Sequence, residues 1–304
     1  MLKYFAFRLA SVLVPILPVW ASYGAAWLGA EIAFLTAAGP RRAVYSNLRR
    51  VMGPDAPEVT MRETARQVFR TVSYNYVDMF LIPRIPPGEL TERVMIMNTQ
   101  AFLDAYREGK GVLITTAHLG NFDLLVQVSV AYDIPVTVLV EPLSPPQMFD
   151  LVNALRSSHG MRLVPVGSHA LREVLRVLRS GGVVAIAADR NIKGRGMEVD
   201  FFGEPATMPT GAVELAMRTG AAIVPCFGLR LPGRRYEISI YPPVQLMGGA
   251  REDGDIRGNM RRLLAVVEDR VRRHPEQWTV FHAVWPGSEL ALPANTRARA
   301  SIER

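Results

Sequence analysis

Short runs of apolar, often β-branched residues alternate along most of the chain with stretches in which apolar positions recur at helical spacing. The first pattern is typical of buried strands and the second of amphipathic helices. The apolar runs predict strands at 94–98, 111–116, 136–140, 161–166, 183–188, 221–227 and, as an antiparallel edge strand, 236–241. Helical spacing predicts helices at 45–52, 60–79, 100–108, 146–159, 168–180, 210–219 and 256–273, and one that begins at Asp123.

Strands and helices that follow one another in turn indicate parallel strands joined by helical crossovers. We therefore expect an α/β fold in which helices flank a central, mostly parallel sheet. The 304 residues, of which 49% are hydrophobic and 21% charged, suffice for one large core. We assign this core to residues 41–286 and expect a disordered tail at 287–304.

The N-terminal region is apolar. Residues 9–30 carry no charge, and a helix of that length would be long enough to cross a bilayer. Pro15 and Pro18 argue against one continuous span. Because no small-residue cleavage site is evident, we expect residues 1–40 to remain as an apolar, membrane-associated segment. The alternative is an ordinary buried hairpin of the globular domain.

The chain is strongly basic. A formal charge of +7 and a pI of about 9.8 indicate an anionic partner, which could be nucleic acid, a membrane surface or a phosphorylated donor such as coenzyme A. The arginine pairs are dispersed and not interleaved with aromatic residues, so we expect no nucleic-acid partner. Pairs at 41–42 and 49–50 could face anionic headgroups on the cytoplasmic face of the plasma (inner) membrane.

Several classes of site are disfavoured. Cys226 is the only cysteine, which fits a reducing compartment and leaves no disulfide or thiolate metal site. The histidines other than His118 lack the spacing of metal ligands, so we expect no metal. No P-loop, dinucleotide-binding glycine motif or Gly-x-Ser-x-Gly elbow is present. We therefore expect no bound cofactor and no serine hydrolase.

His118 follows the predicted strand at 111–116, and Asp123 opens the next helix. Reaction sites of α/β sheets lie beyond the carboxyl ends of the strands, and a histidine there can exchange protons near neutral pH. At this spacing the Asp123 carboxylate could fold back onto one imidazole nitrogen and leave the other as a base. The plainer interpretation is that His118 satisfies a loop and Asp123 caps a helix.

Other polar residues come directly after predicted strands. Glu141 follows the strand at 136–140, and Asp189 and Arg190 follow the strand at 183–188. These side chains should therefore project toward the same sheet edge as His118.

Backbone groups could bind a negative charge at two places. The N–H groups of Gly120 and Asn121 are the candidate donors to an oxyanion. Thr210 and Gly211 begin a helix whose free N–H groups could bind an anion such as a phosphate. The alternative is that these two residues serve only to cap the helix. Before that helix, residues 194–210 are predicted to form a long loop, of the kind that often serves as a lid or binding loop.

The stretch Thr-Ala-His-Leu-Gly-Asn-Phe-Asp, which ends at Asp123, resembles the His-x-x-x-x-Asp/Glu motif of the glycerolipid acyltransferase superfamily. More narrowly, it is similar to the signature of the bacterial lipid A lauroyl/myristoyl acyltransferases and the phosphatidylinositol mannoside acyltransferases. The block Val-Asp-Phe-Phe-Gly-Glu at 199–204 resembles the mannoside enzymes most, and Asp200 departs from the lipid A enzymes. The similarity extends in register over about residues 46–285.

The resemblance implies an acyltransferase domain at 41–286 with His118, Asp123 and Asp189 as catalytic residues. It further implies that Asp189, followed by Arg190, lies close to His118, and that Glu141 and Arg156 line the same pocket. For Glu141 and Arg156 a surface salt bridge is the alternative.

The implied reaction moves a fatty acyl chain from acyl-CoA or acyl-carrier protein to a hydroxyl of a membrane glycolipid, such as a phosphatidylinositol mannoside or a lipid A precursor. A lysophospholipid acyltransferase is the nearest alternative. A non-catalytic lipid-binding protein and a thioesterase are alternatives from other classes.

Overall fold

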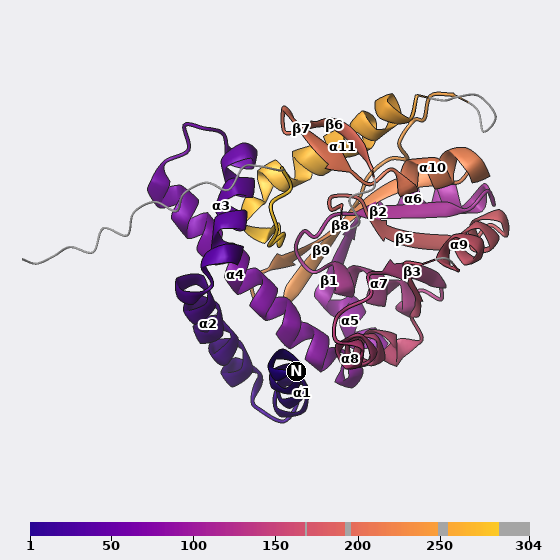
Figure 1. Cartoon of the computed structure of the whole chain (residues 1–304). Coiled ribbons are helices and arrows are strands. Elements are labelled where there is room, and N and C mark those ends of the chain that lie inside the picture. Colours follow the sequence, from indigo (N-terminus) through magenta and orange to yellow (C-terminus); the bar gives the residue numbers. More distant parts are fainter. Residues whose placement is uncertain (168, 192–195, 249–254, 286–304) are drawn as a thin grey trace, which may run out of the picture.

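A seven-stranded sheet forms the centre of the molecule in a computed structural model that describes residues 1–167, 169–191, 196–248 and 255–285 (Figure 1). The strands lie in the order β1-β9-β8-β2-β5-β3-β4. Their bounds are β1 (Val94–Met97), β2 (Val112–Thr116), β3 (Val136–Val140), β4 (Arg162–Pro165), β5 (Val183–Ala187), β8 (Ala222–Leu231) and β9 (Arg235–Ile240). The prediction of an α/β fold with a mostly parallel sheet is confirmed.

Five neighbouring strands, from β8 to β4, are parallel to one another. Strand β9 is antiparallel to β8, and β1 lies parallel to β9 on its outer side. The prediction that the strand at 236–241 lies at the sheet edge is therefore wrong. Strand β1 pairs with the outer side of β9, so β9 is an interior strand. The alternating residues along β9 point to the two faces of the sheet.

Helices cover both faces of the sheet. One face packs against α6 (Thr99–Arg107) and α7 (Phe122–Ala131), and the other against α9 (Ala170–Arg179), α10 (Gly211–Thr219) and α11 (Ile256–Arg273). Along β2, Val112 and Ile114 point to the first face while Leu113 points to the second, and all three are buried. A strand buried on both faces reads as a continuous apolar run, which is why the sequence revealed it.

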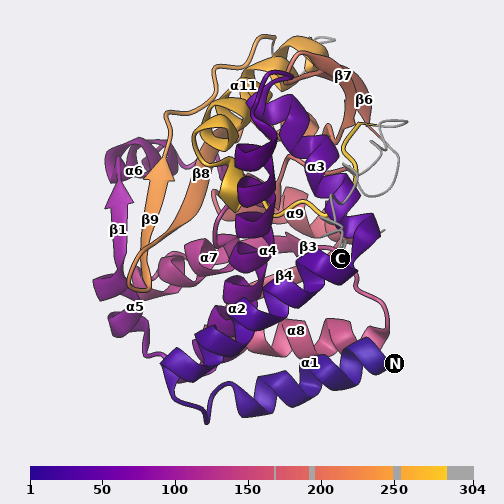
Figure 2. The same cartoon turned by 90° about the vertical axis from the view of Figure 1, so that its left-hand side faces the viewer.

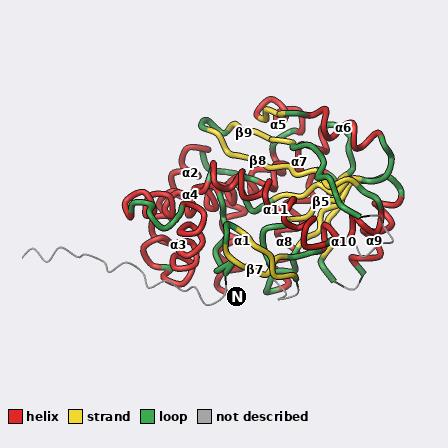
Figure 3. Tube along the Cα trace, turned by 90° about the horizontal axis from the view of Figure 1, so that it is seen from above, coloured by secondary structure: helices red, strands yellow, loops and turns green. Residues whose placement is uncertain are grey.

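The first four helices, α1 (Leu2–Leu13), α2 (Val19–Thr36), α3 (Ala38–Met52) and α4 (Glu58–Leu81), form a separate helical layer. Figures 2 and 3 show α2, α3 and α4 together beside the sheet rather than over either face. Ala30 and Phe34 of α2 are buried in a cluster with Leu48 of α3 and Met61 of α4. Among the described residues, no helix combines the length and apolarity that a membrane crossing requires. Membrane association of residues 1–40 therefore stays a prediction.

Two further helices, α5 (Pro87–Arg93) and α8 (Pro146–Arg156), complete the fold together with the hairpin β6 (Met197–Phe201) and β7 (Glu204–Met208). The prediction of a long loop at 194–210 is wrong over its described part. The hairpin packs on α11, with Phe201 fully buried against Trp278 and Trp285. Each hairpin strand has only five residues, so its apolar–polar alternation is short. The strands are joined by a turn at Phe202 and Gly203, both with positive φ. The predicted tail at 287–304 lies outside the described residues.

Candidate active site

His118 and Asp189 lie side by side at the carboxyl ends of two neighbouring strands. Strands β2 and β5 are paired with Thr116 opposite Ala187, and each candidate residue follows its strand end by two positions. His118 Nδ1 is 2.8 Å from Asp189 Oδ1, and the His118 backbone N–H donates to Asp189 Oδ2 at 2.8 Å. The parallel register therefore builds the pair that the resemblance implied.

Asp189 is completely buried, and Trp278 Nε1 donates a third hydrogen bond to its Oδ2 at 2.8 Å. Burial alone would raise the pKa of this carboxyl group, but the His118 charge and the hydrogen bonds from His118 and Trp278 outweigh it and lower the pKa. Asp189 is therefore ionised near neutral pH and accepts the proton on Nδ1. His118 is 20% exposed, and its Nε2 has no hydrogen-bond partner within the described chain. That nitrogen is free to act as a base.

Asp123 does not occupy the place that its spacing predicted. Helix α7 begins at Phe122, and Asn121 is its N-cap, with Oδ1 accepting from Leu124 N–H at 3.1 Å. Asp123 thus lies in the first turn and contacts α8. Its Oδ1 lies 2.7 Å from Arg156 Nε and its Oδ2 accepts from Nη2 at 3.1 Å. The predicted contact of Asp123 with one imidazole nitrogen is wrong, because Asp123 pairs with Arg156 and the carboxylate at Nδ1 is that of Asp189. A catalytic role for Asp123 remains a prediction.

The prediction of an oxyanion site at Gly120 and Asn121 is also wrong. The Gly120 N–H donates to Gln277 O at 2.9 Å, and the Asn121 N–H donates to Gly228 O at 2.7 Å. Gly120 has a φ of +61°, and a Cβ there would lie 2.0 Å from Gly228 O, so only glycine fits. Both residues hold the loop after β2 in place, and neither N–H is available to substrate.

The other two strand-end residues, Glu141 and Arg190, contact each other. Arg190 Nη2 donates to Glu141 Oε2, and about a quarter of each side chain is exposed (27% and 29%). Arg156 belongs to the Asp123 pair on the adjoining helices. Glu141 and Arg156 thus both form the ion pairs that the sequence analysis gave as their alternative. A pocket shared with His118 stays a prediction.

Thr210 and Gly211 stand where the sequence placed a helix start. Gly211 is the first residue of α10, and Thr210 Oγ1 donates to Glu214 Oε1 at 2.5 Å. This contact joins two side chains of the first turn, and the Thr210 side chain makes no capping hydrogen bond to a backbone N–H. Anion binding at this terminus stays a prediction.

His282 is a site residue that sequence reasoning missed, and Trp278 is another. Partial burial, together with the charges of Arg190 and His118, lowers the pKa of His282 from 6.5 to about 4, although Asp189 opposes the shift. The histidine is therefore neutral near pH 7 and lies within the same charged cluster. The only sequence signal was that His282 lies within about residues 46–285, over which the family resemblance extends. Among the described residues, no group of three or more His, Cys, Asp or Glu is arranged to hold a metal ion.

Comparisons with known proteins identify the family. The model of the family described as bacterial lipid A biosynthesis acyltransferase matches residues 2–286. This chain belongs to that family. It is also 29% identical over 260 residues to a phosphatidylinositol mannoside acyltransferase of Mycobacterium tuberculosis strain H37Rv, covering 81% of this chain and 77% of that protein. A protein of the same name from Mycolicibacterium smegmatis is 26% identical over 265 residues, covering 84% and 83%.

Members of the bacterial lipid A biosynthesis acyltransferase family transfer acyl groups, and the protein is therefore an acyltransferase. The matched residues include every part of the described site, from His118 to His282. The N-terminal helices are included as well, so the family match does not separate residues 1–40 from the catalytic core.

Proposed function

We propose that the protein transfers a fatty acyl chain from a thioester, acyl-CoA or acyl-carrier protein, to a hydroxyl of a membrane glycolipid. The observation that carries this is the buried His118–Asp189 pair, which fixes Nδ1 as the protonated nitrogen and leaves Nε2 as a partly exposed base. No covalent intermediate on the protein is required.

In the proposed reaction, His118 Nε2 takes the proton of the acceptor hydroxyl while the oxygen attacks the thioester carbonyl. The tetrahedral intermediate collapses with cleavage of the carbon–sulfur bond, and the leaving thiolate takes the proton back from the imidazolium. Asp189 stabilises that imidazolium and keeps the ring oriented. The products are an ester and a free thiol, and His118 returns to its starting state.

For the acceptor, we favour a sugar hydroxyl of an amphiphile such as a phosphatidylinositol mannoside or a lipid A precursor. The names of the relatives support this choice. The ion pairs Glu141–Arg190, after strands β3 and β5, and Asp123–Arg156, in the first turn of α7 and on α8, offer the donors and acceptors that a sugar needs. A lysophospholipid acceptor is the alternative.

We further propose that the protein works on the cytoplasmic face of the inner membrane. Large apolar side chains on α1, on α2 and in the turn between them are exposed, and such a surface is typical of membrane contact. These residues are Phe5, Leu9, Val12, Leu13, Ile16, Leu17, Val19, Trp20, Trp27, Leu28, Ile32 and Leu35. The net charge of +7 would favour anionic headgroups.

The test is a comparison of the protein with His118→Ala. Palmitoyl-CoA is offered with phosphatidylinositol mannoside, with a lipid A precursor, with lysophosphatidic acid or with no acceptor, and products are identified by mass spectrometry. We expect an acylated glycolipid from the parent protein and none from the variant, whose melting temperature stays close to the parent's. Thiol release without acceptor would indicate a thioesterase, and acylation of lysophosphatidic acid alone would refute the glycolipid assignment. Near-normal turnover by the variant would overturn the mechanism.

A further inference from the structure

Asp78, on helix α4, is a buried carboxylate outside the His118–Asp189 pair. It is 3% exposed and accepts hydrogen bonds from three other elements. Tyr23 of α2 donates its hydroxyl to Oδ1, while Arg230 of β8 and the amide of Asn121 donate to Oδ2, the latter at 2.7 Å. A carboxylate buried at this depth requires such partners, and it in turn fixes their positions.

One connection runs from Asp78 directly to the loop that carries His118. Asn121 lies three residues after His118, and its side chain both donates to Asp78 and caps helix α7. On the same loop, the carbonyl of Gly120 accepts from Asn75 Nδ2, also on α4, at 2.6 Å. Helix α4 therefore holds the end of the loop through two side chains.

A second connection runs through Arg230. The Arg230 backbone N–H donates to Gln277 Oε1 at 2.9 Å, and Gln277 Nε2 donates to the Arg230 carbonyl at 3.0 Å. The Gln277 carbonyl accepts the Gly120 N–H at 2.9 Å. Asp78 thus meets the His118 loop by two routes, and neither passes through Asp189.

The guanidinium of Arg230 is enclosed by aromatic rings. Its central carbon lies 5.6 Å from the ring centres of both Tyr23 and Tyr74, and 5.3 Å from that of Tyr236. Cation–π contacts of this kind restrict the arginine without neutralising it, so the Asp78 charge is what balances it. The Tyr23 hydroxyl binds Asp78, whereas the Tyr74 hydroxyl makes no hydrogen bond within the described residues.

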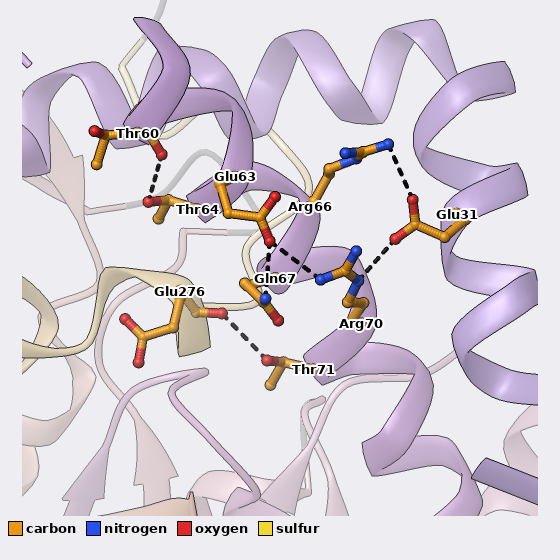
Figure 4. A network of polar contacts seen from close by, with 9 residues as sticks. All are labelled: Glu31, Thr60, Glu63, Thr64, Arg66, Gln67, Arg70, Thr71 and Glu276. Atoms are coloured by element: carbon orange, nitrogen blue, oxygen red, sulfur yellow. Dashed lines mark hydrogen bonds and ion pairs between the residues drawn. The ribbon is translucent and has the colours of Figure 1, made fainter. Parts of the chain in front are cut away.

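Helix α2, which carries Tyr23, is held on α4 at a second place, about two turns further along. There Glu31 pairs with Arg70 at 2.7 Å and with Arg66 at 3.3 Å (Figure 4). Two polar contacts, one at Asp78 and one at Glu31, thus bind the same pair of helices. Only the contact at Asp78 also reaches the His118 loop.

We propose that Asp78 is a positioning residue for acyl transfer: it fixes the loop that carries His118 and, through Tyr23, joins that loop to helix α2. The inference rests on the proposed role of His118 as the base. A base displaced by a fraction of an ångström from its reaction geometry loses rate without losing the ability to bind substrate. Asp78 therefore contributes to kcat and little to the KM of the thioester donor.

Tyr23→Phe and Asn121→Ser test the proposal without removing the buried charge. The first removes the hydroxyl that binds Asp78, and the second keeps an N-cap oxygen but removes the amide donor. We expect each to lower kcat roughly tenfold, with an unchanged KM for palmitoyl-CoA. Because both act through Asp78, the double variant should lose much less than the product of the two single effects.

Two control variants separate positioning from general loosening. Tyr74→Phe removes a hydroxyl from the neighbouring ring, and Glu31→Gln weakens the other α2–α4 contact; both should keep the parent kcat. If Asp78→Asn folds, it should lower kcat more than either single variant. If it does not fold, Tyr23→Phe, Asn121→Ser and their double variant test the proposal. Multiplicative losses in the double variant, a parent-like kcat in Tyr23→Phe, or an equal loss of kcat in the controls would overturn the proposal.

His118→Ala separates this proposal from the proposed function. An active His118→Ala variant would overturn the role of His118 as the base. An inactive His118→Ala variant together with an unaffected Tyr23→Phe variant would overturn only the role of Asp78.

Discussion

At the residue scale, the chemistry depends on which atoms face the two carboxylate oxygens of Asp189. Oδ2 accepts from two fixed donors, the His118 backbone N–H and Trp278 Nε1, and Oδ1 faces His118 Nδ1. All three groups require an acceptor. The site therefore has no place for a donor at residue 189.

We predict that Asp189→Asn lowers kcat by about a hundredfold or more. The amide oxygen will serve the two fixed donors, so the amide N–H₂ will face Nδ1 and leave the ring proton on Nε2, where it blocks the base. Asp123→Asn should cost less, because Asp123 binds Arg156 and not the imidazole. Steady-state kinetics with saturating acceptor measure both. A larger loss in Asp123→Asn would show that the structural pairing is not the catalytic one.

A second residue-scale prediction concerns His282, whose pKa is lowered to about 4 from 6.5. Between these pH values the unfolded chain binds a proton that the folded protein does not, so stability falls as pH drops from about 6.5 to about 4. His282→Gln removes this contribution. Its melting temperature should therefore depend less on pH than that of the parent in this interval, while the two follow similar curves above pH 7. Parallel curves throughout would contradict the prediction.

At the element scale, helix α2 presents two different faces. Ala30 and Phe34 are buried against α3 and α4, whereas Trp20 is 79% and Trp27 46% exposed. Deleting the segment would therefore damage the helical core as well as any lipid contact. Substitution of exposed side chains is the cleaner way to examine membrane binding.

We predict that Trp20→Ser together with Trp27→Ser weakens binding to anionic vesicles by about tenfold or more. Burial of one large apolar side chain stabilises the bound state by about 1.5–3 kcal/mol, and each tenfold change corresponds to about 1.4 kcal/mol. Leu171→Ser is the control, because Leu171 is also exposed (48%) but lies on α9, on the opposite side of the molecule from α2 (Figure 1). Vesicle co-sedimentation measures all three. Equal binding by the double variant and the parent would locate the lipid contact elsewhere.

At the scale of the whole molecule, the charge of +7 adds a long-range attraction to the local apolar contact. We predict that raising salt from about 0.1 M to about 1 M reduces vesicle binding but does not abolish it, because the Debye length falls from about 10 Å to about 3 Å while apolar burial persists. Neutral vesicles should bind more weakly than anionic ones at low salt and about equally at high salt. Complete release at high salt would indicate a purely electrostatic contact.

The sequence by itself determined the strands of the central sheet, most of the helices and the position of His118 after β2. Those features depend on local periodicity and on short motifs, which a linear pattern carries. It also placed Asp189, Arg190 and Glu141 at strand ends. That Asp189 lies close to His118 was predicted only from the family resemblance. The hairpin at 197–208 was missed because its short strands are separated from the central sheet and are buried against α11 and the C-terminal aromatic residues.

Only the tertiary structure decided which partner each polar group has. Asp123 is five positions from His118 and Asp189 is 71 positions away, yet the register of β2 with β5 places the distant carboxylate on the imidazole. Likewise, the N–H groups of Gly120 and Asn121 are occupied by carbonyls of Gln277 and Gly228, from remote parts of the chain. A buried polar group must find a partner, but strand order and register choose among the candidates. Those are properties of the assembled sheet, and local spacing does not encode them.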